Sequence, residues 1–166
     1  MLRLTHFDKQ GRTKMVDVSK KPETLREAVV RGSISMNPAT FKKIMTGEIS
    51  KGDVLAVAKV AGIMAAKKTS DIIPMCHPLN LSHVEINFYP VERASRIDIE
   101  ACVRIKAQTG VEMEGLVAVA AAGLTIYDMC KAIDRGMVLS DIHLVMKKGG
   151  RSGTFSVRSS ESGVRR

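Results

Sequence analysis

The sequence predicts an α+β protein in which helices pack on one face of an antiparallel sheet. Residues 83–89 and 96–106 alternate apolar and polar side chains, which is typical of strands with one buried and one wet face. Residues 54–66 are apolar nearly all round and residues 115–127 carry no charge, which is typical of buried helices. Such helices and strands bury their apolar surfaces against each other as two layers.

Three helices are expected in the first half of the chain. One is predicted over residues 22–32, because Pro22 suits a first helical turn and a glycine stands at the other end. A short helix is predicted over residues 37–47. A third is predicted over residues 50–68, since serine caps helices well and Ser50 precedes the apolar stretch.

The second half is expected to hold three strands and one long helix. Strands over residues 83–89 and 96–106 are joined by a short segment that contains a proline, which predicts a hairpin. A helix is predicted over residues 110–135, and Gly136 closes it. Residues 141–147 alternate as the earlier strands do and are predicted to be a further strand of the same sheet.

Length and composition favour one domain over residues 1–153 and a flexible basic tail over residues 154–166, with about 15 mobile residues at the N-terminus. The longest uncharged apolar run is too short to cross a bilayer, and no signal peptide is visible, so a cytoplasmic protein without a membrane partner is expected. The three cysteines have neither zinc-site spacing nor the even number of a disulfide framework.

The net charge of +9 indicates an anionic partner. Residues 147–166 hold six basic groups and one acidic group, so much of the excess lies at the C-terminal end. No aromatic residues interleave with the basic ones and no nucleic-acid motif is present, which favours a small anion over a polymer. A basic nucleic-acid-binding module is kept as the alternative.

A carboxylate and an ammonium follow the uncharged stretch over residues 115–127. Asp128 and Lys131 are three residues apart, so they share a face of a helix. A charged side chain at the edge of an apolar region is costly to bury, so it either forms an ion pair or serves a function. The spacing fits a structural ion pair and a working site about equally.

Lys51 and the segment around His77 are further candidates. Lys51 is expected in the first turn of the 50–68 helix, where a cation is disfavoured unless a phosphate docks beside it; a solvated lysine is the alternative. Two prolines bracket Met75, Cys76 and His77, and this rigid segment either presents His77 to a ligand or is an ordinary turn. Metal ligation by this pair of Cys and His is weakly supported, because no further ligand stands nearby.

Two further segments carry charged candidate residues, over residues 109–114 and 147–153. Thr109 and Glu112 have capping-box spacing and Glu114 lies in the first helical turn, so structural roles could explain both acids. The segment KKGGRSG, residues 147–153, joins glycines to basic residues as phosphate-binding loops do. It lacks the strand–loop–helix spacing of a P-loop.

Four segments together resemble one family, the cyclic pyranopterin monophosphate synthases, also called molybdenum cofactor biosynthesis protein C. They are LTHFDKQGRTKMVDVSKKPETLREA, KGDVLAVAKVAGIMAAKKTSDIIPMCHPL, TGVEMEGLVAV and LTIYDMCKAIDRGM. The resemblance covers residues 4–153. It implies a ferredoxin-like fold, a homohexamer built as a trimer of dimers, and a lyase that acts on a small molecule and not on nucleic acid.

The implied substrate is (8S)-3',8-cyclo-7,8-dihydroguanosine 5'-triphosphate, which becomes cyclic pyranopterin monophosphate with release of diphosphate. The resemblance makes Asp128 catalytic, with Lys51 and Lys131 assisting. It implies no cofactor and no metal ligands, and leaves open whether a divalent cation accompanies the triphosphate. The residues expected to bind substrate are Met75, Cys76, His77, Met113, Glu114, Glu112, Arg26 and Lys147.

Geometry adds one expectation of its own. Met113 and Asp128 are 15 residues apart on one predicted helix, which places them about 22 Å apart along its axis. One ligand cannot touch both ends of that helix. The sequence therefore predicts an active site shared between subunits.

Overall fold

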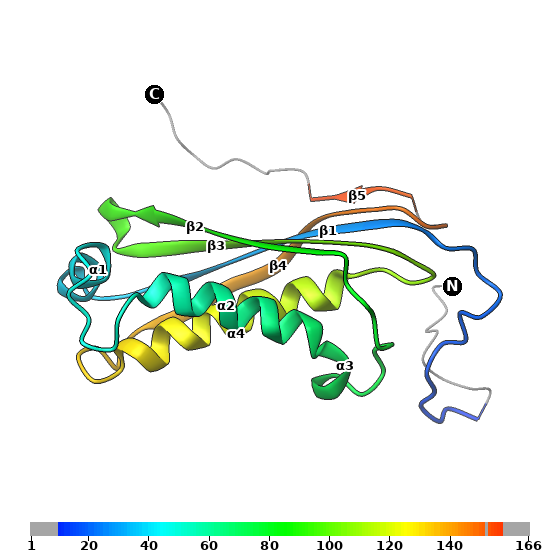
Figure 1. Cartoon of the computed structure of the whole chain (residues 1–166), viewed down its shortest axis with the longest axis horizontal. Helices are drawn as coiled ribbons and strands as arrows, with labels where there is room; N and C mark the ends of the chain where they lie inside the picture. The colour runs from blue at the N-terminus through cyan, green and yellow to red at the C-terminus, as the bar shows by residue number, and fades with distance from the viewer. Residues whose placement is uncertain (1–9, 152, 158–166) are drawn as a thin grey trace.

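The computed structural model describes residues 10–151 and 153–157. It shows one five-stranded antiparallel sheet with helices packed on one face (Figure 1). The strand order is β2-β3-β1-β4-β5. The strands are β1 (Thr24–Ser35), β2 (His83–Val91), β3 (Arg96–Ala107), β4 (Val138–Lys148) and β5 (Phe155–Ser156), and the helices are α1 (Pro38–Met45), α2 (Val54–Lys67), α3 (Thr69–Ile72) and α4 (Glu112–Cys130).

This arrangement confirms the predicted α+β, ferredoxin-like fold. Helices connect β1 to β2, and α4 connects β3 to β4, while β3 and β1 lie between the strands so joined. Each half is thus a split β-α-β unit. The main core fills the space between the sheet and helices α2 and α4.

Helix α4 lies close against the sheet because two of its residues have no side chain. A Cβ atom at Gly115 would stand 2.7 Å from Val30 Cγ2, and one at Gly123 would stand 2.8 Å from Leu139 Cδ2. Both distances are shorter than van der Waals contact allows. The two glycines therefore fix how α4 sits, and with it the positions of the charged residues at its two ends.

Among the described residues, α4 is the one helix long and apolar enough to span a membrane by length and composition. It packs against α2 and against strands β1, β3 and β4. Half of its apolar stretch is buried inside the protein, as the central helix of a packed core would be.

The predicted helix over residues 22–32 is wrong, because this segment forms the central strand β1. Ala28, Val30 and Ile34 alternate along it and are fully buried toward the helices. Strands β3 and β4 pair with β1 on either side and bind its backbone groups. At Gly32 a Cβ would stand 2.7 Å from Val119 Cγ1, so the glycine serves close packing and ends no helix.

Other helix boundaries also differ from those that the sequence predicts. The side chain of Asp53 caps α2 by accepting a hydrogen bond from Ala56 N at 3.0 Å, so Ser50 is not the cap and Lys51 precedes the helix. Helix α4 ends at Cys130, earlier than expected. The short helix and the hairpin are confirmed, and the last predicted strand is found as β4, whose pairing with β1 shifts register twice.

The expected flexible tail includes a short ordered strand. Phe155 and Ser156 pair with Lys147 and Met146 of β4. Residues 158–166 of the predicted tail, and the first nine of the residues predicted to be mobile at the N-terminus, lie outside the described residues.

A buried carboxylate holds the segment after α4 in place. Asp134 accepts hydrogen bonds from the backbone N–H groups of Asn37 at 2.8 Å and Gly136 at 3.0 Å. The bond from Asn37 is the main cause that lowers the pKa of Asp134. The start of α1 is thereby joined to the segment after α4 that begins at Lys131.

Candidate active site

Three charged side chains meet at the C-terminal end of α4. Asp128 lies in its last turn, and Lys131 follows as the residue that ends the helix. Lys131 Nζ is 2.7 Å from Asp128 Oδ1, so the two residues form the ion pair that their spacing allows. Lys51, from the turn before α2, donates a hydrogen bond to the backbone oxygen of Asp128 at 2.9 Å, and its Nζ is 3.7 Å from Oδ2.

The two lysines hold Asp128 in its ionised form. The hydrogen bond and charge of Lys131 lower the pKa of this carboxyl, and the charge of Lys51 adds to the effect. The same pairing raises the pKa of Lys131. At neutral pH the cluster thus presents a carboxylate that can accept a proton, between two ammonium groups that can hold phosphate oxygens.

The single chain does not supply the dry surroundings expected for this pair. The side chain of Asp128 is 60% exposed, and those of Lys131 and Lys51 are 54% and 46% exposed. Lys51 also stands outside the helix, so the expected conflict between its charge and the helix N-terminus does not arise. Its contact with Asp128 is the stronger reason to place it in a site.

The other end of α4 carries a buried acid. Glu114 is only 4% exposed. Burial raises its pKa, and the negative charge of Glu112 adds to the shift. No ion pair to Glu114 occurs within the described part of the chain. Its carboxyl therefore keeps a proton to higher pH than an exposed glutamate does.

Replacing Glu114 by glutamine is expected to stabilise the protein increasingly as pH rises. Below the ordinary pKa of 4.5 the carboxyl is neutral in both the folded and the unfolded chain. Above it the unfolded chain ionises first, because the folded pKa is raised, so wild-type stability falls until the folded pKa is passed. Glutamine is uncharged throughout, and the gain should reach the order of 1 kcal/mol.

Urea unfolding of both proteins at about pH 4 and about pH 8, at one fixed protein concentration, measures this difference. The matched control is Glu112→Gln, which removes a paired carboxylate from the same helical turn and should bring no stabilisation. A constant difference between wild type and Glu114→Gln across this range would contradict the raised pKa.

The segment that holds Met75, Cys76 and His77 lies beside this end of α4. Its backbone forms a turn, in which Cys76 N donates to Ile73 O at 3.0 Å, so the rigid segment is not extended. Burial and the nearby charge of Glu114 raise the pKa of the Cys76 thiol. His77 is half-buried, and its Nε2 forms a hydrogen bond with the backbone oxygen of Val16 at 2.8 Å.

Arg26, Glu112 and Lys147 line a common open cavity of about 780 Å³. Lys147 Nζ binds Glu112 Oε1 at 2.8 Å. Glu112 thus forms an ion pair across the cavity and does not form the predicted capping box, since α4 has no side-chain cap at its start. Arg26 donates from Nε and Nη2 to the backbone oxygens of Ala107 and Gln108.

Residues 147–151 of the KKGGRSG segment, whose glycines resemble those of phosphate-binding loops, also line this cavity. Gly149 and Gly150 have φ values of 95° and 75°, which favour glycine. A Cβ at Gly150 would overlap the guanidinium of Arg26. The glycines therefore let this loop close around Arg26 while Lys148 and Arg151 face the same space. The sequence named these two cations only as part of that loop, and it gave no role to Lys20 and Lys21, which line the cavity as well.

The predicted site residues therefore form two groups within one chain. Lys51, Asp128 and Lys131 meet at one end of α4. The other end carries Glu112, Met113 and Glu114, and beside it lie the segment over residues 75–77 and the cavity. The expected separation of about 22 Å between Met113 and Asp128 holds, because both lie on one continuous helix.

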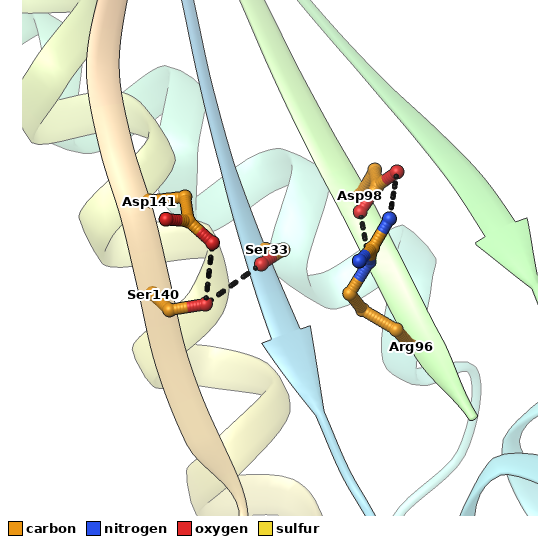
Figure 2. Close-up of polar contacts among 5 residues, drawn as sticks. All are labelled: Ser33, Arg96, Asp98, Ser140 and Asp141. Carbon is orange, nitrogen blue, oxygen red and sulfur yellow. Dashed lines mark hydrogen bonds and ion pairs between the residues drawn. The ribbon is translucent and has the colours of Figure 1, made fainter. Parts of the chain in front are cut away.

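A second hollow, of about 530 Å³, lies on the face of the sheet that no helix covers. Figure 2 shows polar contacts in and beside this hollow: Arg96 binds Asp98 through two hydrogen bonds of 2.6 and 3.1 Å, and Ser140 contacts Ser33 and Asp141, each at 3.0 Å. No predicted site residue lines this hollow. Within the described residues, no cluster of three or more His, Cys, Asp or Glu side chains could hold a metal ion.

Fold and site together define a ferredoxin-like protein that places a proton-accepting carboxylate between two cations and carries a separate cationic cavity. These are the features of an enzyme that acts on a phosphorylated small molecule. The model of the MoaC family matches residues 15–150, and the chain belongs to this family.

Curated relatives agree with this assignment. The chain is 58% identical over 152 residues to a cyclic pyranopterin monophosphate synthase of Heliobacterium modesticaldum, covering 92% of this chain and 96% of the relative. It is 59% identical over 154 residues to the enzyme of the same name from Thermoanaerobacter pseudethanolicus, covering 93% and 98%. A third, from Desulfitobacterium hafniense, is 58% identical over 154 residues, covering 93% and 94%.

Proposed function

We propose that this protein is a cyclic pyranopterin monophosphate synthase, a lyase of molybdenum cofactor biosynthesis. Its substrate is the cyclised dihydroguanosine triphosphate named above. The ring system is opened and rebuilt into a pyranopterin, the sugar phosphate closes to a cyclic monophosphate, and diphosphate leaves. Family membership and the named relatives support this function. The observation that carries it is the ionised Asp128 held between Lys131 and Lys51.

Asp128 is proposed to act first as a base. It is ionised at neutral pH and can accept a proton from the substrate, while the two lysines that lower its pKa make it a weaker base than an isolated carboxylate. Lys131 and Lys51 then stabilise the negative charge that develops on the phosphate or the opening ring. Glu114, whose pKa is shifted the opposite way by burial, is suited to donate a proton.

The active site is proposed to lie between subunits of a homohexamer built as a trimer of dimers. The base at one end of α4 and the acid at the other are 14 residues apart, about 21 Å along the axis. One small ligand spans less than that, so the two groups that serve it would come from two copies. The exposure of Asp128, Lys131 and Lys51 in the single chain is also what an unassembled half-site would show.

An apolar surface near these groups supports such an assembly. Val57, Val60 and Met64 on α2 and Leu124 on α4 are each about half exposed or more. They lie on the helical layer that carries both half-sites. Exposed apolar patches of this kind are typical of protein–protein contacts.

The test is to add the cyclised triphosphate to the purified protein and measure diphosphate and the pyranopterin product. We expect both in equal amounts, and neither with GTP, whose ring system is not cyclised. Protein treated with EDTA should keep its turnover, since no resident cofactor is proposed; a divalent cation arriving with the triphosphate is compatible with the scheme. A cytoplasmic location is proposed with this function. Absence of both products from the cyclised substrate would refute the assignment.

A further inference from the structure

The segment before β1, here called the strap (residues 16–22), links His77 to the cationic cavity. At one end the backbone oxygen of Val16 accepts a hydrogen bond from His77 Nε2, 61 residues away in the sequence. At the other end Lys20, Lys21 and Pro22 line the cavity. One short stretch of chain thus touches both a predicted substrate-binding residue and the space where Arg26 and Lys147 lie.

The strap has a defined conformation between these two contacts. The backbone N–H and the hydroxyl of Ser19 both donate to Asp17 Oδ1, at 2.9 and 2.6 Å. Lys21 N donates to Val18 O at 2.9 Å and closes a turn. These bonds direct the two lysines toward the cavity while Val16 stays on His77.

The cavity holds more positive charge than its acids balance. Its cations are Lys20, Lys21, Arg26, Lys147, Lys148 and Arg151. Its two carboxylates are already engaged, Glu112 with Lys147 and Glu27 with Arg104 outside the cavity and, more weakly, with Lys148. Within the described residues, no ion pair involves Lys20 or Lys21. An excess of four positive charges around one space is a binding site for a polyvalent anion.

We propose that Lys20 and Lys21 bind the polyphosphate end of the ligand in this cavity, and that the strap positions them through its contact with His77. The inference rests on the proposed function for the identity of the ligand. It adds to that function two phosphate-binding residues and a positioning role for His77 and the strap. A linear diphosphate or triphosphate is the chemical class that fits, because the volume of about 780 Å³ exceeds the needs of a single phosphate.

The double variant Lys20→Gln/Lys21→Gln tests the binding role. Inorganic triphosphate, titrated into the full chain by calorimetry at low salt, should bind about tenfold more weakly to the variant than to the wild type. The KM for the cyclised substrate should rise by a similar factor, with kcat within about twofold, because the lysines hold phosphate without taking part in proton transfer. Both lysines are exposed, so the fold should be unaffected.

The matched control is Lys42→Gln/Lys43→Gln, an adjacent exposed pair on α1 that removes the same charge outside the cavity. It should bind inorganic triphosphate as the wild type does. Equal weakening by both double variants would reduce the effect to net charge and overturn the proposal. Unchanged triphosphate affinity in Lys20→Gln/Lys21→Gln would overturn it too, while turnover of the substrate would leave the proposed function standing.

Asp17→Ala tests the strap separately, because it removes the turn with Ser19 and keeps both lysines. We expect weaker binding of inorganic triphosphate and a raised KM for the substrate. Wild-type affinity in this variant would overturn the positioning role of the strap. A wild-type protein that binds inorganic triphosphate through these lysines but releases no diphosphate from the cyclised substrate would refute the proposed function and support the cavity assignment.

Discussion

Replacing Asp128 by asparagine is expected to lower kcat for the cyclised substrate by about a thousandfold. Asparagine has the same shape, and its Oδ1 can still accept the hydrogen bond from Lys131 that the carboxylate accepts at 2.7 Å. It cannot take up a proton. The change should therefore remove the base and leave the geometry of the helix end intact. Steady-state release of diphosphate measures kcat and KM for both proteins.

The binding step should change little in this variant, so kcat/KM should fall with kcat. The control is Glu92→Gln, which neutralises an exposed carboxylate in the turn between β2 and β3 that forms no ion pair within the described residues. It should keep wild-type turnover. An Asp128→Asn protein that retains more than about a tenth of the wild-type kcat would rule out Asp128 as the base.

Mixing two inactive variants is expected to restore activity if the site is shared between subunits. Glu114→Ala removes the acid at the start of α4 and Asp128→Ala removes the base near its end. In a dimer of one copy each, one of the two sites combines the intact Asp128 of the first copy with the intact Glu114 of the second. Random pairing of equal amounts should recover about one quarter of wild-type activity.

The matched control mixes Glu114→Ala with Glu112→Ala. Both changes lie at the same end of α4, so every mixed site keeps one defect and no activity should return. Exchange of subunits is checked by mass spectrometry of the mixture. If exchange is complete and the first mixture stays inactive, each chain builds its own site and the shared-site proposal fails.

The strands of the sheet could be predicted from the sequence where one of their faces is exposed to solvent. In β2 and β3 polar residues alternate with apolar ones, since one side meets water and the other the core. Strand β1 was predicted as a helix because Pro22 and Gly32 stand where a helix would begin and end. Its charged residues Glu27 and Arg31 give no local sign of a strand. In the structure each pairs across the sheet, Glu27 with Arg104 and Arg31 with Glu100. Their partners lie far away in the sequence, where local patterns carry no information.

The candidate site, too, could be predicted from the sequence only in part. The pairing of Asp128 with Lys131 follows from their spacing at the end of a helix. Lys51 approaches Asp128 from 77 residues away, and only resemblance to a family placed the two together. The cavity was the hardest feature to predict from the sequence, because the strap and β4 bring Lys20 and Lys148 to it from opposite ends of the chain.

The length of helix α4 also fixes the spacing between the two groups of proposed site residues at its ends. Adding one residue within it would turn everything beyond by about 100° and advance it by about 1.5 Å. Gly115 and Gly123 seat the helix on the sheet, so it could not rotate to compensate without a clash with Val30 or Leu139. Asp128 would then face away from Lys51 while Glu114 stayed where it is. If Asp128 and Glu114 have the proposed roles, the number of residues from Glu112 to Cys130 is set by catalysis as well as by packing.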